Sequence, residues 1–390
     1  MSLIIINQYY APFHAATGQL IQELAEYLVS KGKRVTVITG KNGEYDLKDE
    51  EIINEVQVIR IKNRKDGIKR IKKFLSYATF YFRLKKRLKK IVEDGSIVLA
   101  MSTPPYIARI PLTLKKKRNV KLIYNVQDLY PEILLALGKM KENNIIYRFL
   151  HKIAEMIVKG ADRVIPIDES MKEILENNYK PLKNRITVIE NWALKELGPN
   201  GFQKKSSKKL TILYSGNMGR AHEYETLLKA IKGSEKSEMD FIISGGGYNY
   251  NQLKREVEDF PNVIFQDFVS KEKLPDLINK ADICLVIGNK NLSGIVVPSK
   301  FYGYIACQKP VIYINSGEDI ISKHINNGNL GYKINNGDSK KLIDMLRKLA
   351  RNKDEIRKIQ KNVAIYSEKL NRNNSLERYY DLICKMEESI

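Results

Sequence analysis

Three loops carry residue types that favour the binding of phosphate. The first contains Thr17 and Gly18 at the start of a predicted helix, where free backbone N–H groups attract an anion. The second leaves an apolar strand at Gly216 and reaches Arg220, which offers a fixed positive charge. The third places Lys300 in the first turn of a predicted helix, where a lysine is unfavourable unless an anion joins it. These loops predict a site for a phosphate-bearing ligand.

Each loop also has a plainer interpretation. Gly18 would serve the turn alone, Arg220 would be a surface arginine beside a tight turn, and Lys300 would be solvated. A further glycine run at 245–247 follows a strand but lacks the GxGxxG spacing, so it does not predict NAD binding.

Alternating strands and helices must position these loops. Short apolar runs between helical periodicities predict parallel α/β units, with ligands at the carboxyl ends of the strands. Thr17 is expected to cap the first helix. The predicted strands are 3–6, 35–38, 97–100, 122–125, 163–167 and 186–189 in the first half, and 210–214, 240–244, 263–266, 283–287 and 311–314 in the second.

The alternation of predicted strands and helices is interrupted once, which predicts a domain boundary. Residues 193–209 are rich in Gly, Ser and Lys and have no periodicity. The predicted organisation is an α/β domain over 1–192, this linker, a second α/β domain over 210–370, and a helix over 371–390. A chain of 390 residues suits two domains.

Composition limits the compartment and the partners. The net charge of +22 favours phosphate-bearing partners, although a Lys- and Asn-rich composition alone would also produce it. Three cysteines without a CxxC pair argue against a zinc site or a disulfide framework. No secretory signal and no membrane-spanning run are visible, so we expect a cytoplasmic protein that rests on the inner face of the membrane.

A basic amphipathic stretch at 64–91 favours that surface position. Its apolar residues recur at three- and four-residue steps, and its cations suit anionic lipid. The alternative is an ordinary domain helix whose apolar face packs in the core, and both can hold together. The residues predicted to contact membrane or acceptor are Lys72, Lys73, Phe74, Arg83, Lys86 and Arg87.

Several stretches in the correct order resemble the family-4 glycosyltransferases of the GT-B fold. They include YYAPFHAATGQLIQELAEYLVSKG and NVQDLYPEILLALG in the first half, and LYSGNMGRAHEYETLLKAI and GIVVPSKFYGYIACQKPVIYI in the second. The chain is most similar to the subgroup that builds bacterial exopolysaccharide, capsule or O-antigen. The resemblance implies two Rossmann-like domains facing each other across a cleft, with the C-terminal helix returning to the N-terminal domain.

The resemblance also implies roles for individual residues. Arg220 and Lys300 would neutralise the donor diphosphate, and Gln127 and Asp128 would lie near the transferred sugar. The other residues implied to bind the donor are Thr17, Gly18, Gly216, Asn217, Gly219, His222, Glu223, Gly246, Phe265, Phe268, Val269, Pro298, Ser299 and Gly303.

One departure from the family concerns the donor ribose. The wider family has two glutamates eight positions apart, which fall here at Ile295 and Gly303. His222 or Glu223 is a hypothetical substitute for the one that holds the ribose.

The carboxylates near the acceptor are less well defined. Asp128 is the first candidate, with Glu132 one turn on, and the alternative is that Asp128 caps a short helix that starts at Pro131. Asp168 and Glu169 also follow a strand and are weaker candidates.

The implied reaction is a retaining hexosyl transfer without a bound metal or another cofactor. The donor is expected to be a UDP-sugar, carrying an N-acetylhexosamine or a related sugar, and the acceptor a lipid-diphosphate-linked or polysaccharide precursor. The alternatives are a nucleotide-sugar 2-epimerase of the same fold, and a non-enzymatic protein that binds nucleic acid or membrane. The basic helix and PSKFYGYIA argue against the epimerase, and no nucleic-acid-binding motif accompanies the charge, so no nucleic-acid partner is expected.

Overall fold

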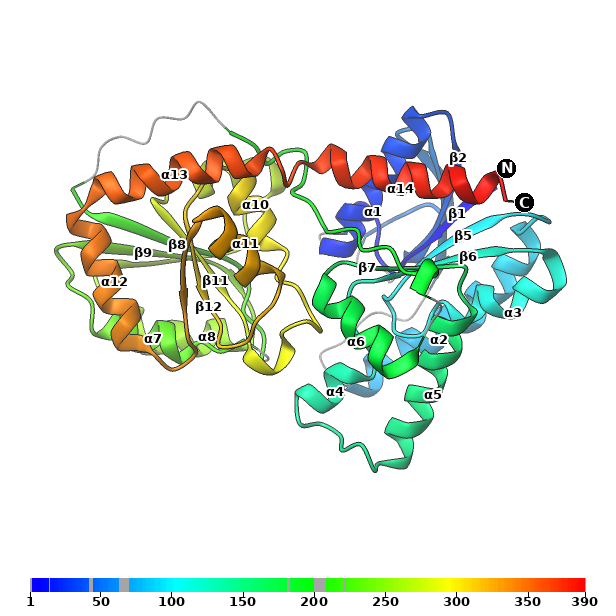
Figure 1. Cartoon of the computed structure of the whole chain (residues 1–390), viewed down its shortest axis with the longest axis horizontal. Coiled ribbons are helices and arrows are strands. Elements are labelled where there is room, and N and C mark those ends of the chain that lie inside the picture. The colour runs from blue at the N-terminus through cyan, green and yellow to red at the C-terminus, as the bar shows by residue number, and fades with distance from the viewer. Residues whose placement is uncertain are drawn as a thin grey trace. The chain divides into compact units, whose positions relative to one another are not determined.

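The computed structural model describes residues 2–13, 15–41, 45–62, 70–180, 183–199, 208–220 and 222–389. Its contacts divide the chain into two compact units. The first unit contains Met1–Asn191 and Asn373–Ile390, and the second contains Trp192–Arg372 (Figure 1). Each unit has its own sheet, so the predicted α/β class with two largely parallel sheets is confirmed.

The first unit is built on a sheet whose described strands lie in the order β3-β4-β2-β1-β5-β6-β7. Neighbouring strands are parallel except for the hairpin of β3 and β4. The bounds are β1 Ser2–Ile6, β2 Arg34–Lys41, β3 Glu50–Ile53, β4 Val56–Lys62, β5 Ile97–Met101, β6 Lys121–Val126 and β7 Arg163–Pro166.

The helices of the first unit include one from the end of the chain. Helices α2, α3 and α5 pack in series, and α6 packs against α5. The C-terminal helix α14 joins this unit through an ion pair between Lys33 and Glu387, with 2.5 Å between Nζ and Oε2, and through a hydrogen bond between Asn125 and Tyr379. The bounds are α1 Ala16–Ser30, α2 Arg70–Ile91, α3 Arg109–Arg118, α4 Glu132–Ala136, α5 Ile145–Gly160, α6 Glu169–Tyr179, η1 Lys183–Arg185 and α14 Arg372–Glu387.

The second unit has a parallel sheet in the order β10-β9-β8-β11-β12-β13. Helices α7, α8 and α12 pack together on one face of it, and α10, α11 and α13 lie on the other (Figure 1). Its strands are β8 Leu210–Asn217, β9 Met239–Gly246, β10 Val263–Gln266, β11 Ile283–Ile287, β12 Val311–Ile314 and β13 Gly331–Ile334. Its helices are α7 Glu225–Lys232, α8 Tyr248–Val257, η2 Lys271–Lys273, α9 Leu274–Asn279, η3 Lys290–Leu292, α10 Lys300–Ala306, α11 Ile320–Gly328, α12 Ser339–Arg351 and α13 Lys353–Ser367.

The two sheets confirm most of the predicted strands, with two kinds of error. The hairpin of β3 and β4 was not predicted, because its turn at Asn54 and Glu55 has positive φ at both residues without the usual Asn-Gly signal. The predicted strand at 186–189 is wrong. Thr187 and Ile189 donate N–H bonds to β7, but the only ladder contact described there is an isolated bridge between Ile186 and Val164.

The described helices show no candidate for a membrane crossing, because none of them is both long and apolar enough.

Candidate functional site

Strand order places the candidate loops of the second unit side by side. The order reverses at β8 and β11, since the chain moves outward from β8 to β9 and β10 and then returns to β11 on the other side. Open parallel sheets bind ligands outside the carboxyl ends of their strands at such a reversal. The loop that follows β8 contains Gly216 and Arg220, and the segment that follows β11 leads to Lys300.

Lys300 is the first residue of α10 and sends its ammonium group to the end of β8. Its Nζ lies 3.8 Å from the centroid of the Tyr214 ring. This nitrogen is buried and has no hydrogen-bond partner among the described residues, although other parts of the side chain reach solvent. Burial lowers the pKa of Lys300 to about 7. A buried ammonium without a partner is costly, so an anion would stabilise its charged form.

Gly216 provides the space for that ammonium. A Cβ atom at Gly216 would lie 3.3 Å from Lys300 Nζ, and the φ of +128° disfavours any residue with a side chain. Gly216 pairs with Gly245 at the end of β9, where a Cβ atom would lie 2.1 Å from the Gly216 carbonyl oxygen. The glycines of both strands therefore allow a close approach of backbone at this corner of the sheet.

Arg220 lies at the surface of the same corner. Its guanidinium carbon stands 3.8 Å from the centroid of the Tyr248 ring, at the start of α8. Stacking on an aromatic ring holds a guanidinium without consuming its N–H donors. Asn217 and Gly219 complete the loop, with Asn217 exposed.

His222 and Glu223 follow the loop, and both keep one unpartnered buried atom. The Nδ1 of His222 has no described partner, and burial together with nearby Lys300 lowers the pKa of this imidazole to about 4. His222 is therefore neutral at pH 7. The Oε1 of Glu223 accepts a hydrogen bond of 2.8 Å from the Thr226 N–H at the start of α7, whereas Oε2 has no described partner. Glu223 thus bonds the first turn of α7 with one oxygen, from the position before the N-cap residue Tyr224, and leaves its other oxygen without a described partner.

The aromatic residues predicted for the nucleotide base separate into two roles. Phe265 is half-buried and packs against the core, edge-on to Tyr250 with 5.5 Å between the ring centroids. Phe268 is 62% exposed and lies so close to Gly246 that a Cβ atom there would be 3.1 Å from the ring. Phe268 is therefore the exposed aromatic surface beside the glycine run, and half-buried Val269 follows it.

The segment before Lys300 contains the remaining predicted donor residues. Pro298 is half-buried and Ser299 is exposed, and Ser299 occupies the N-cap position of α10 without a side-chain capping bond. Gly303 is buried, and a Cβ atom there would lie 2.8 Å from Leu197 Cδ1. The position where the wider family has its ribose-binding glutamate is therefore filled by packing, so Gly303 has a structural explanation of its own.

The first loop differs from its prediction. Helix α1 begins at Ala16 with Ala15 as its N-cap, so the expected cap by Thr17 is wrong, because Thr17 already lies inside the first turn. Its Oγ1 instead accepts a long hydrogen bond of 3.5 Å from Asn7 Nδ2. Gly18 is buried, and a Cβ atom there would stand 3.1 Å from the backbone of Tyr9. Close packing of the loop thus explains this glycine without a ligand.

Asp128 lies at the carboxyl end of β6 in the first unit. The backbone N–H groups of Gln127 and Asp128 both donate to Ser102 Oγ, at 3.0 and 3.3 Å, which fixes this turn against the end of β5. Burial raises the pKa of Asp128 to about 6. The alternative that Asp128 caps α4 is wrong, because the N-cap of α4 is Pro131 and no side chain caps it.

Gln127 has a structural role in this unit. Its Nε2 donates to Asn125 Oδ1 at 2.8 Å and to Asn191 Oδ1 at 3.1 Å, and its Oε1 accepts from Asn191 at 2.8 Å. Both amide hydrogens are used, and the side chain is buried. The amide therefore joins β6 to the segment before the second unit, and the expectation that Gln127 lies near the transferred sugar stays a prediction.

The other carboxylates of the first unit also have structural partners. Glu132 accepts hydrogen bonds from the Tyr179 hydroxyl and from Asn178 Nδ2, so it holds α6 against α4. Asp168 caps α6 by accepting from the Ser170 N–H at 2.7 Å. Glu169 pairs with Lys172. Of the four candidate carboxylates, Asp128 is the one for which no such partner is described.

Over 75–91, where its side chains are described, helix α2 shows the predicted amphipathic pattern, and its apolar stripe packs into the core. Phe80, Leu84 and Leu88 are fully buried, so they pack in the core of the first unit. Arg83 donates to the Lys62 carbonyl and Arg87 pairs with Glu50, whereas Lys86 is exposed. The side chains of Lys72, Lys73 and Phe74 lie outside the described residues.

Sequence reasoning missed the aromatic partners of the two cations. Tyr214 was placed where the strand meets the loop but given no role, and Tyr248 was not singled out, although it directly follows the glycine run. An aromatic residue beside a glycine loop is a usable signal for a stacked arginine. The face to which Tyr214 points cannot be known without the sheet.

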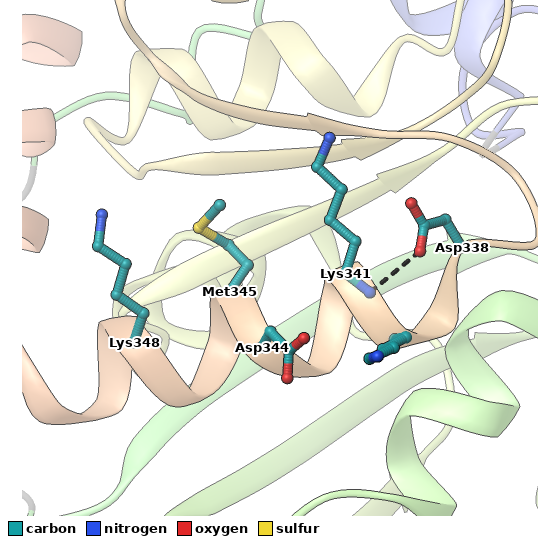
Figure 2. A pocket seen from close by; sticks show the side chains of 6 residues that line it. Asp338, Lys341, Asp344, Met345 and Lys348 are labelled. Atoms are coloured by element: carbon teal, nitrogen blue, oxygen red, sulfur yellow. Dashed lines mark hydrogen bonds between the residues drawn. The ribbon is translucent and has the colours of Figure 1, made fainter.

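A shallow depression of about 350 Å³ elsewhere in the second unit does not include the candidate residues. It lies along α12, where Asp338 caps the helix by accepting from the Lys341 N–H at 3.0 Å (Figure 2). Its lining comes from one helix surface, so it offers no converging groups for a nucleotide. The lining residues are Asp338, Lys340, Lys341, Asp344, Met345 and Lys348.

Known proteins share the fold of this chain. Sucrose-phosphate synthase from Thermosynechococcus elongatus matches all of the chain and all of its own with a TM-score of 0.79 at 16% identity. The lipopolysaccharide glycosyltransferase WaaG matches 98% of this chain and 99% of its own with a TM-score of 0.72 at 15% identity. These likenesses show the fold.

Sequence comparison identifies the family. The family model described as Glycosyltransferase Family 4 matches residues 17–193, and the model described as Glycosyl transferases group 1 matches residues 200–366. The probable glycosyltransferase WbjE of Pseudomonas aeruginosa is 25% identical over 66% of this chain and 66% of its own length. The putative colanic acid biosynthesis glycosyl transferase WcaI of Escherichia coli is 23% identical over 78% of this chain and 81% of its own. The chain therefore belongs to the family-4 glycosyltransferases of the GT-B fold.

Proposed function

We propose that this protein transfers a sugar from a nucleotide-sugar donor, whose diphosphate binds at the carboxyl ends of β8 and β11. The observation that carries the proposal is the buried Lys300 ammonium, which has no described partner and occupies the space left by Gly216. An anion is the group that such a nitrogen lacks.

The donor is proposed to be a UDP-sugar with an N-acetylhexosamine or a related sugar. In support, HepE of Anabaena, which shares the fold with TM-scores of 0.70 and 0.71 at 13% identity, was solved with UDP and with UDP-glucose. Phe268 offers an exposed aromatic face for the base beside Gly246.

The acceptor is proposed to be a lipid-diphosphate-linked precursor of a surface polysaccharide such as exopolysaccharide, capsule or O-antigen. The colanic acid assignment of the relative from Escherichia coli supports polysaccharide synthesis. The charge of +22 supports an anionic acceptor and a peripheral position at the inner face of the cell membrane.

The proposed reaction is a retaining transfer that requires no metal. The bond between the anomeric carbon and the diphosphate breaks while the acceptor oxygen forms the new bond, and the acceptor's proton passes to the departing diphosphate oxygen. Arg220, protonated Lys300 and backbone N–H groups would neutralise the charge that develops on the departing diphosphate. Asp128 is proposed to hold the acceptor hydroxyl because, of the four candidate carboxylates of the first unit, it is the one without a described structural partner.

A two-step assay tests this function. Melting of the full chain is first followed with UDP, GDP and ADP and their common sugar derivatives. The stabilising donor is then incubated, with and without lipid-linked acceptors and with and without EDTA, and the products are identified by mass spectrometry and by the NMR signal of the new anomeric centre.

The expected product is an acceptor-dependent glycoside of retained configuration, formed equally with and without EDTA. A change within the donor that needs no acceptor would instead support the 2-epimerase. Stabilisation by none of the nucleotides would overturn the proposal.

A further inference from the structure

Strands β8 and β11 are neighbours in the sheet of the second unit, but their pairing stops before their carboxyl ends. Among the described residues the ladder between them ends at the pair of Leu213 and Cys284, although β11 continues to Ile287. On its other side β8 stays paired with β9 as far as Asn217. The sheet therefore opens between β8 and β11, at the reversal of strand order where parallel sheets bind ligands.

The hydroxyl group of Tyr304, on helix α10, lies at this opening. Tyr304 is buried, and its hydroxyl accepts a hydrogen bond of 3.0 Å from the Ser215 N–H in β8. The same hydroxyl donates to the Ser215 carbonyl oxygen at 3.3 Å. These are the two backbone groups that a neighbouring strand would pair, and buried backbone groups are rarely left unpaired. Tyr304 therefore replaces β11 as the partner of β8 at this position.

The same helix carries Lys300 to the residues on either side of Ser215. Lys300 precedes Tyr304 by four residues, so both lie on one face of α10. The Lys300 ammonium nitrogen lies 3.8 Å from the centroid of the Tyr214 ring, and a Cβ atom at Gly216 would lie 3.3 Å from it. Helix α10 thus meets three consecutive residues of β8, the outer two through Lys300 and the middle one through Tyr304.

The other side of α10 is fixed by the core of the second unit. The buried Phe301 ring stacks on that of His324 in α11, with 5.7 Å between the centroids and 13° between the planes. Helix α10 also packs against β11, β12 and α13. The core therefore sets the position of α10, whereas the Tyr304 hydroxyl joins the open end of β8 to it.

We propose that Tyr304 is a positioning residue for the donor diphosphate. Its hydroxyl holds the end of β8 at the distance from α10 that places the Lys300 ammonium beside Gly216. A binding group contributes most to affinity when its geometry is fixed before the ligand arrives. Tyr304 is buried and acts through Lys300, without contact to the ligand, and this role rests on the proposed function because it concerns the same diphosphate site.

Tyr304→Phe tests the hydroxyl separately from the ring. The substitution keeps the buried ring and leaves the Ser215 N–H and carbonyl without their partner. The variant is expected to remain folded, to melt a few degrees lower than the wild type, and to bind nucleoside diphosphate about tenfold more weakly. Calorimetric titration of whichever of UDP, GDP and ADP the wild type binds measures the affinity.

A double-mutant cycle with Lys300→Met distinguishes positioning from a general loss of stability. If Tyr304 acts through Lys300, Tyr304→Phe should change nucleotide affinity less than about twofold in the Lys300→Met background. An equal loss in both backgrounds would show that Tyr304 supports the site without Lys300, and would overturn the proposal. Equal affinity of Tyr304→Phe and the wild type would overturn it as well.

The pH dependence of the free energy of unfolding is a second measurement, and it needs no nucleotide. Burial lowers the pKa of Lys300 to about 7 in the folded protein, so above this pH the unfolded chain binds the additional proton. The free energy of unfolding of the wild type should therefore rise between about pH 7 and 9. Of the titratable groups beside Lys300, His222 has a pKa of about 4 and burial raises the pKa of Tyr214, so neither titrates in this range.

The rise with pH should be smaller in Tyr304→Phe. Release of the end of β8 would let water reach the Lys300 ammonium, and its pKa would return toward the unperturbed value of 10.5. A rise as large as that of the wild type would contradict the positioning role, because the ammonium would then be buried without the Tyr304 hydroxyl.

Tyr379→Phe is the matched control. It removes the hydroxyl of a tyrosine that is 2% exposed, against 1% for Tyr304, and that bonds to Asn125 in the first unit. This variant should also melt at a lower temperature. Its nucleotide affinity and its rise of the free energy of unfolding with pH should equal those of the wild type.

The two measurements separate the positioning role from the proposed function. A wild type that binds no nucleoside diphosphate, but whose rise with pH is reduced by Tyr304→Phe, would refute the function and leave the positioning of Lys300 intact. Nucleotide binding that depends on Lys300 but not on Tyr304 would support the function and refute the positioning role.

Discussion

The ammonium nitrogen of Lys300 lies 3.8 Å from the centroid of the Tyr214 ring, directly against the end of β8. An aromatic face attracts a cation but does not accept a conventional hydrogen bond from it. The contact positions the charge without neutralising it, so the nitrogen keeps its donors for a ligand. A lysine that would be unfavourable in the first turn of a helix is thereby retained in the fold.

Gly216→Ala should weaken donor binding. The new Cβ atom would press on Lys300 Nζ, at 3.3 Å, and the φ of +128° would be strained by about 1–3 kcal/mol. We expect a lower melting temperature and an affinity for nucleoside diphosphate reduced about tenfold, measured by calorimetric titration. Gly337→Ala is the matched control, since its φ of +88° is also strained but nothing lies within 4 Å of the added atom. Equal nucleotide affinity in both variants would remove Gly216 from the site.

The pH dependence of stability should report the buried Lys300. Its pKa is about 7 in the folded protein and 10.5 when unperturbed, so the unfolded chain binds more protons between these values. Stability contributed by this group therefore rises as pH increases from about 7 to 10.5 and is flat below and above that window. Urea unfolding at several pH values should show this rise in the wild type and not in Lys300→Met. If the free energy of unfolding depends on pH in the same way in both proteins, the pKa of Lys300 is not lowered by burial.

Asp128→Asn should remove an acidic limb from the pH profile of transfer. The pKa of Asp128 is about 6, raised by burial, so kcat/KM of the wild type should fall about tenfold per pH unit below 6 if the carboxylate is required. The pH dependence of the free energy of unfolding has the opposite sign to that of an acid whose pKa is lowered by a salt bridge. The folded protein binds more protons than the unfolded chain between about pH 4 and 6, so this contribution falls as pH rises through that range. Asp128→Asn should therefore be at least as stable as the wild type at pH 7, and an acidic limb that persists in it would assign the limb elsewhere.

Glu223 can be tested for two roles at once. Glu223→Ala removes the acceptor for the Thr226 N–H and should cost about 0.5–2 kcal/mol of stability. Glu223→Gln keeps an oxygen for that bond and should melt close to the wild type. If the free Oε2 holds the donor ribose, the KM for the donor should rise in both variants, measured by steady-state kinetics. An unchanged KM in both would leave Glu223 with its bond to the first turn of α7 alone.

The elements of the fold were largely predictable because strands buried on both faces give continuous apolar runs. The runs at 3–6, 97–100 and 283–287 are each found in a strand. The hairpin of β3 and β4 was not predictable, since Asn54 and Glu55 adopt positive φ without a glycine. The apolar run at 186–189 predicted a strand, but the segment only lies beside β7 and forms an isolated bridge there. Its place next to the sheet, which the local sequence does not show, determines this outcome.

The candidate site was predictable only where a residue type is unfavourable in the secondary structure that the sequence predicts for it. Lys300 at the start of a helix was such a conflict, and its ammonium is now found beside Gly216. Gly18 gave a similar signal, but the backbone of Tyr9 accounts for it through a packing distance that no sequence pattern shows. The apolar stripe of α2 and the apolar side chains on the outer face of α5 have the same periodicity, and only the fold determines that the first is buried and the second exposed.

Calorimetric titration of UDP, GDP and ADP into the wild type and Lys300→Met decides whether Lys300 holds the donor diphosphate. At least one nucleoside diphosphate should bind the wild type, and Lys300→Met should bind it about 10²-fold more weakly while remaining folded, with kcat reduced by about 10²–10³. Tightest binding at or below pH 7, where Lys300 is protonated, is part of the same prediction. Equal affinity and turnover in the two proteins would contradict the assignment of the diphosphate to Lys300.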